Sequence, residues 1–149
     1  MDSNQELYTQ DFAAWCATTA ALLRAEKWHD IDPLALAEEI DSLGRSQKRE
    51  LESRMHVLVM HLLKWRYQPT GPQEGRNWRS TIRIQRLDLG LLLRDNPSLR
   101  PQLPMVLTER YPAARLHASD ETGLPLAALP ATCPWTVEQV LDSEFWPQA

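Results

Sequence analysis

The sequence predicts an all-α fold, a helical bundle around one long or glycine-kinked helix with an irregular C-terminal wrap. Apolar residues recur at spacings of three and four in several segments, which is typical of amphipathic helices. No segment shows strand alternation bounded by hairpin turns. Because 149 residues with 43% hydrophobic content suffice for one core, we expect a single domain over residues 1–149.

The first helix is expected at about residues 9–26. Phe12, Trp15 and Leu22 supply its apolar side, and Asp11 lies where the positive end of a helix dipole favours a carboxylate. Residues 28–30 then make a short connection to the next helix.

The organising helix is expected at residues 33–66. Asp32 can accept hydrogen bonds from first-turn amides, and Pro33 suits the first helical position. The apolar row of this helix consists of Leu36, Ile40, Leu43, Leu51, Leu58, Leu62 and Trp65. The row keeps its phase through Gly44, but glycine costs ~1 kcal/mol relative to alanine in a helix, so we expect a kink there. A helix of this length spans ~50 Å, more than the ~40 Å diameter of a compact chain, so it should bend back or pack on a partner.

A loop is expected at residues 67–76, where prolines and glycines cluster, and a third helix at residues 77–94. Residues 98–121 are expected to form two helices, 98–111 and 112–121. The reason is that Pro104 and Pro112 cannot both be accommodated without a bend or a restart.

The C-terminal segment carries two local signals. Gly123 is expected to be the left-handed cap of the preceding helix, and Thr136 followed by Gln139 predicts a capping box for a last helix at 136–141. The segment is also too apolar for a loose tail, so we expect it to wrap back over the helices.

Net charge is −4, and it is distributed unevenly. Residues 1–44 carry two basic and nine acidic groups, a balance of −7, whereas residues 64–100 carry eight and three, a balance of +5. The N-terminus does not resemble a signal peptide, and no apolar run reaches the ~20 residues of a membrane span, so we expect a cytoplasmic protein with no membrane partner. Cys16 and Cys133 are expected to be reduced thiols.

The strongest polar pattern is a stripe of arginines in the third helix. Together with neighbouring residues it defines a candidate interaction surface of Trp65, Arg66, Tyr67, Arg76, Trp78, Arg79, Arg83 and Arg86, and Lys64 lies beside it in sequence. The arginines could follow phosphates while the aromatic rings offer stacking surfaces. Alternatively, the arginines pair with the acidic first 44 residues, within one subunit or across a dimer.

Histidines in the organising helix raise the question of a metal site. His56 and His61 differ by ~140° around a helix, so they do not share a face, whereas Glu52 and His56 do at the i, i+4 spacing. A metal centre needs at least three protein ligands, so a Glu52–His56 pair on the helix surface is favoured and no metal or cofactor is expected.

The order of motifs resembles a known family. The matching pieces are YTQDFAAW with ALLRAEKW, then LAEEIDSLGRSQKRELESRMHVLVMHLLKWRYQP, NWRSTIR, NPSLRP, ETGLP and CPWTVEQVLD. They resemble the bacterial family called domain of unknown function twenty-nine, and they cover almost the whole chain. The resemblance implies an all-helical fold, and it brings no established activity and no catalytic residues.

Three functions remain open from the sequence. The first is a non-enzymatic helical module that binds a protein partner or a second copy of itself, as a homodimer. The second is a nucleic-acid-binding or regulatory protein that uses Arg76, Arg79, Arg83 and Arg86. The third is a metal-dependent enzyme around Glu52, His56 and His61, to which folding could bring His117 or an acidic residue. The sequence favours the first function, because this function does not require a site assembled from residues that are distant in sequence. The sequence assigns no catalytic residue.

Overall fold

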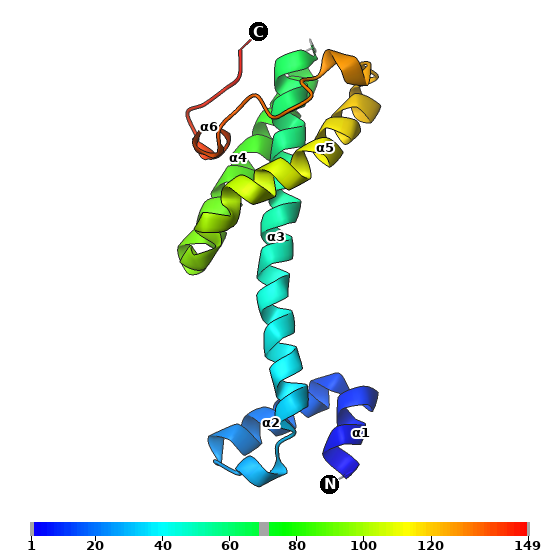
Figure 1. Ribbon diagram of the computed structural model, residues 1–149, viewed down its shortest axis with the longest axis vertical. Helices are drawn as coiled ribbons and strands as arrows, with labels where there is room; N and C mark the ends of the chain where they lie inside the picture. Colours follow the sequence, from blue (N-terminus) through cyan, green and yellow to red (C-terminus); the bar gives the residue numbers. More distant parts are fainter. Residues whose placement is uncertain (1, 69–71, 149) are drawn as a thin grey trace. The chain divides into compact units, whose positions relative to one another are not determined.

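The computed structural model describes residues 2–68 and 72–148 and confirms the all-α fold (Figure 1). No strand occurs within these two ranges. None of the helices described is both long and apolar enough to cross a membrane. Contacts divide the chain into two compact units, Met1–Ser46, here the N-terminal unit, and Gln47–Ala149, here the C-terminal unit.

The N-terminal unit begins with two helices, α1 (Asp2–Gln10) and α2 (Phe12–Arg24), where we expected one helix from residue 9. Asp11 separates them. Its side chain accepts a hydrogen bond from the amide of Ala14 at 3.1 Å, so it is the N-cap of α2 rather than a residue inside a helix. The short helix η1 (Trp28–Asp30) follows.

Helix α3 (Pro33–Tyr67) starts as its sequence predicts. Asp32 Oδ1 accepts from the amides of Leu34, at 3.1 Å, and Ala35, at 3.3 Å. The helix is continuous through Gly44, so the glycine at which we expected a kink does not end it. One glycine costs a helix ~1 kcal/mol relative to alanine. This cost is small compared with the stability that the helix gains from its hydrogen bonds and its apolar row on both sides of Gly44.

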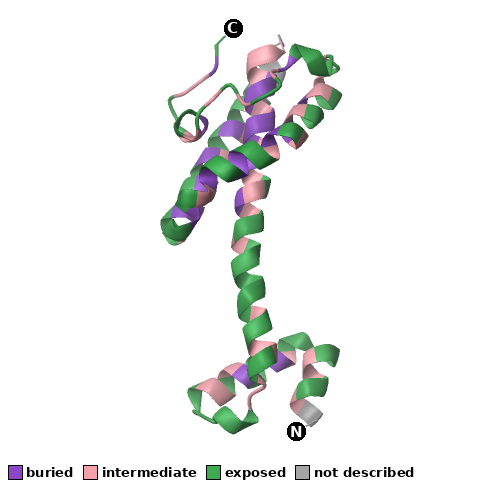
Figure 2. Ribbon diagram, in the orientation of Figure 1, coloured by how far each residue is buried: buried purple, intermediate pink, exposed green. Residues whose placement is uncertain are grey.

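Burial along α3 changes sharply although the apolar row is continuous (Figure 2). Leu51, Leu58 and Leu62 are fully buried in the C-terminal unit. Ile40 and Leu43, earlier in the same row, are 59% and 67% exposed. The periodicity of the row therefore predicts the helix, but it does not predict which residues of the row are buried.

Helix α4 (Pro72–Asp95) starts earlier than the expected residue 77. The backbone is already helical from Pro72, which fits a first helical position because proline needs no amide hydrogen there. Part of the expected loop, residues 69–71, lies outside the described residues. Arg54 of α3 holds α4 by donating to Asp88, at 3.0 Å, and to Gln85, at 3.3 Å.

The next segment differs from the two helices that we expected. It forms η2 (Pro97–Gln102) and then one helix, α5 (Leu103–Thr122), which contains Pro112. Pro104 lies in the first turn of α5, where no intrahelical donor is lost, so only Pro112 removes a hydrogen bond. Burial of Leu107, Tyr111 and Ala114 on either side of that position holds the helix together. Gly123 ends it with φ +75°, as predicted.

The C-terminal segment covers the C-terminal unit, as predicted. It contains η3 (Leu126–Ala128) and α6 (Val137–Leu141), and Thr136 and Gln139 form the expected capping box. Leu129 and Val140 are buried in the core formed by α3, α4 and α5, and Trp146 packs against that core. The segment therefore supplies part of the core of this unit.

Candidate interaction surfaces

The arginine stripe of α4 is divided by the structure. Arg76, Arg79 and Arg83 are exposed, whereas Arg86 is only 6% exposed. Arg86 Nε donates to the carbonyl of Val140 at 2.8 Å, and its Nη2 donates to the carbonyl of Gln139 at 3.4 Å. These carbonyls belong to the end of α6, where the helix dipole favours a cation. One member of the stripe thus anchors the C-terminal segment.

The other arginines border a hollow beside this anchor. The hollow has a volume of about 580 Å³ and lies between α4 and the C-terminal segment. Its lining, here the basic hollow, consists of Arg79, Arg83, Arg86, Leu87, Leu141, Ser143, Glu144 and Trp146. Arg76 does not line it. The bend of the C-terminal segment therefore turns part of a helical stripe into a concave basic surface.

Aromatic rings of the candidate surface face other residues of the same unit. Trp65 and Trp146 have ring centroids 4.9 Å apart. The guanidinium groups of Arg79 and Arg86 each lie 5.4 Å from the Trp146 ring, within cation–π range. Lys64 approaches Trp78 and Arg66 approaches Tyr67 in the same way. The rings thus stabilise the packing of the C-terminal unit, and they are not arranged as a row of open stacking surfaces.

Lys64, adjacent to the stripe in sequence, points inward. It is buried and donates to Glu121 of α5, a half-exposed carboxylate. This hydrogen bond lowers the pKa of Glu121 below its usual value. Lys64 therefore joins α3 to α5 and does not extend the exposed basic surface.

His56 forms a different pair from the one expected. It is buried, and its Nε2 lies 2.8 Å from Nδ1 of His117 on α5, while Glu52 makes no hydrogen bond to it. Arg110 Nη2 lies 3.4 Å from the other ring nitrogen of His56. Because a guanidinium can only donate, His56 Nδ1 accepts and its Nε2–H donates to His117. The expected Glu52–His56 surface pair is wrong because burial turns His56 toward α5.

His61 lies apart from this pair and bonds the carbonyl of Val57 at 2.8 Å. Over residues 2–68 and 72–148, no group of three or more His, Cys, Asp or Glu side chains is placed to hold a metal ion. Glu52, His56 and His61 therefore do not converge into the centre that the enzymatic hypothesis requires.

Acidification is expected to destabilise the C-terminal unit through His56. Burial, together with His117 and Arg110, lowers the pKa of His56 below 6.5, and burial also lowers the pKa of His61. As pH falls below about 6.5, the unfolded chain therefore takes up protons that the folded chain does not, and the free energy of unfolding decreases. Urea denaturation between about pH 7.5 and about pH 5.5 measures this slope. His56→Gln should flatten it, and equal slopes in wild type and variant would contradict the assignment.

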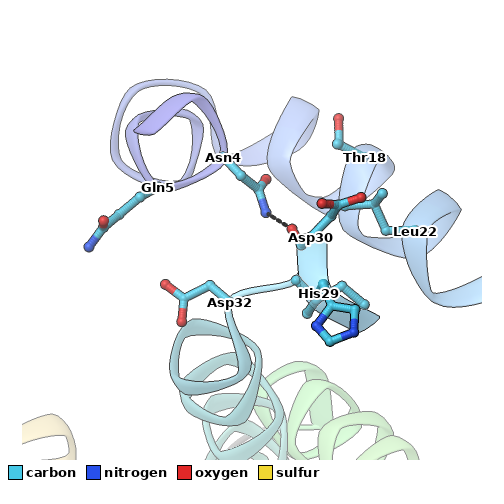
Figure 3. Close-up of a pocket in the computed structure, with 8 residues that line it drawn as sticks. Asn4, Gln5, Thr18, Leu22, His29, Asp30 and Asp32 are labelled. Carbon is cyan, nitrogen blue, oxygen red and sulfur yellow. Dashed lines mark hydrogen bonds between the residues drawn. The ribbon is translucent and has the colours of Figure 1, made fainter. Parts of the chain in front are cut away.

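A second hollow lies within the N-terminal unit (Figure 3). Asn4, Gln5, Thr18, His29, Asp30 and Asp32 contribute its polar lining. Asn4 donates to the backbone carbonyl of Asp30 at 3.3 Å, and Asp32 is the cap of α3. Tyr8 donates to Glu39, and this bond raises the pKa of Tyr8 to about 12. These groups join α1, η1 and α3 within the unit.

Apolar side chains of the N-terminal unit are mostly exposed. Only Trp15 and Thr19 are buried among its described residues. Phe12, Trp28, Leu34, Ile40 and Leu43 are large apolar side chains between 49% and 82% exposed. Ile40 and Leu43 share one side of α3, because they are three residues apart. The unit therefore exposes several large apolar side chains, of which Ile40 and Leu43 lie together on α3.

The acidic side of this unit makes few ion pairs. Among the described residues, Arg45 pairs with Glu38 at 3.1 Å. Both partners are more than half exposed, so the pair contributes little to stability.

Two contributors escaped the sequence reasoning, and a third has another role than the one considered. Arg110 is 54 positions from His56, and no local pattern joins them. Trp146 belongs to the apolar C-terminal segment, and the sequence did not indicate that it lies against both Arg79 and Arg86. His117 was considered only as an addition to Glu52, His56 and His61 in a metal site, and it instead pairs with His56.

The fold and these surfaces define an all-helical protein with two units. The chain matches the family model described as Domain of unknown function DUF29 over residues 7–146, so it belongs to that family. The family brings no assigned function. No curated protein and no solved structure matches the chain.

Proposed function

We propose that the protein is a non-enzymatic helical interaction module that self-associates through its N-terminal unit. The observation that carries this proposal is the exposure of five large apolar side chains, Phe12, Trp28, Leu34, Ile40 and Leu43, in a unit whose described residues include only one buried large apolar side chain. A segment of this size buries too little of its own surface to be stable by hydrophobic burial alone, and neighbouring exposed apolar residues, such as Ile40 and Leu43 on one side of α3, are typical of protein contacts.

A second copy of the chain is the occupant that we propose. The same surface on two chains can form a self-complementary two-fold contact without any further component. Residues 1–46 carry three basic and nine acidic groups, a balance of −6, so two such units repel one another at low salt. Salt should therefore strengthen self-association, whereas it would weaken the binding of a basic protein partner.

Sedimentation or light scattering of the full chain at micromolar concentration tests the proposal. The wild type is expected to be a dimer, and Ile40→Asp with Leu43→Asp is expected to be a monomer of unchanged helicity by circular dichroism. Ile84→Asp is the matched control, because Ile84 is similarly exposed but lies on α4 of the C-terminal unit. A monomeric wild type at both low and high salt would refute self-association.

The proposal includes a location in the bacterial cytoplasm. Cys16 and Cys133 are both free thiols, as is usual for proteins of a reducing compartment. The alternative, nucleic-acid binding through the arginine stripe, has weaker support. Arg86 points inward, and the aromatic rings pack against neighbours within the unit. These residues therefore do not form a row of arginines along a nucleic-acid backbone with aromatic rings free to stack on bases.

A further inference from the structure

We propose that the basic hollow is a binding site for an oxyanion, and specifically for the phosphoryl group of a small ligand. The site lies wholly in the C-terminal unit and is independent of the apolar surface discussed above. Arg86, Arg79 and Arg83 are the residues that would bind the anion, because all three line the hollow.

Arg86 provides the first argument, because its buried positive charge has no ion pair within 4 Å in the described part of the chain, and Asp142 acts on it only from farther away. Nε and Nη2 donate to backbone carbonyls, which are neutral acceptors. Nη1 is buried and has no hydrogen-bond partner in the described part of the chain. A buried, unpaired cation is costly, and an anion in the adjoining hollow would offset that cost.

Arg79 and Arg83 provide the second argument. They are one helical turn apart, both are exposed, and neither forms an ion pair with a described carboxylate. Guanidinium groups recognise phosphoryl oxygens through paired N–H donors, and three such groups suit the oxygens of a phosphate better than the two of a carboxylate. The hollow also leaves room for the group that carries the phosphate.

Two features limit the choice of ligand. Glu144 lines the hollow and opposes any anion, so the site is not uniformly basic. The Trp146 ring lies against Trp65 and two guanidinium groups, so it is not a free stacking surface for a nucleobase. The chemistry therefore favours a compact phosphoryl group over a stacked single strand.

Titration of the full chain with inorganic phosphate at low ionic strength, followed by calorimetry or Trp fluorescence, tests the site. Saturable one-to-one binding is expected. Arg83→Gln should weaken it by about tenfold or more, since a charged hydrogen bond is lost. Arg76→Gln is the matched control, with the same charge change on the same helix outside the hollow, and should change affinity by less than about twofold. Arg86 is left intact because it anchors α6.

Glu144→Gln should have the opposite effect on phosphate affinity. Removing this opposing charge should tighten phosphate binding. Acetate should bind more weakly than phosphate. The proposal is overturned if phosphate does not saturate, if Arg76→Gln and Arg83→Gln lose affinity equally, or if acetate binds as tightly as phosphate.

Discussion

Replacing Leu62 by alanine is expected to lower the free energy of unfolding of the C-terminal unit by about 2–5 kcal/mol. Leu62 is fully buried on α3 at the centre of the core formed with α4 and α5, so alanine would leave a cavity that its neighbours can fill only in part. Chemical denaturation of the full chain, followed by circular dichroism, measures the change.

Leu116→Ala is the control for this substitution. It removes the same atoms from α5, but Leu116 is about half exposed, so a change within about 0.5–1 kcal/mol is expected. Similar losses at Leu62 and Leu116 would mean that the core is not where the structure has it.

Arg86→Ala is expected to destabilise the C-terminal unit by about 2–4 kcal/mol and to release α6 from α4. The substitution leaves the carbonyl of Val140 without its donor, removes one of two donors to the carbonyl of Gln139, and opens a gap beneath Trp146. Trp fluorescence reports the release, because Trp146 lies beside Trp65 and would become more exposed to water.

Arg83→Ala tests whether charge alone explains that effect. Arg83 precedes Arg86 by one turn of α4 and loses the same charge, yet it is exposed and makes no hydrogen bond to α6. The free energy of unfolding of the Arg83→Ala variant should remain within about 0.5 kcal/mol of wild type. If Arg86→Ala changed neither the free energy of unfolding nor the Trp fluorescence, the guanidinium would not anchor the C-terminal segment.

These predictions separate features that look alike in the sequence. Leu43 and Leu62 belong to one apolar row, and Arg83 and Arg86 to one basic stripe, but one member of each pair is buried and the other exposed. Periodicity specifies which residues share a side of a helix. It does not specify whether another element covers that side.

The sequence by itself determined the helical class, the start of α3 at Asp32 and Pro33, the end of α5 at Gly123, and the capping box at Thr136. Each of these depends on hydrogen bonds or dihedral preferences within a few residues, which a local pattern records. Their outcome does not depend on how distant segments pack.

Only the tertiary structure decided the roles of Arg86, His56 and Lys64. Their partners are 53 to 61 positions away in α5 and the C-terminal segment. It also decided that α5 passes through Pro112, because burial of its neighbours outweighs one lost hydrogen bond. The roles of these residues and the continuity of α5 depend on which helix surfaces pack together. A single sequence indicates this packing only indirectly.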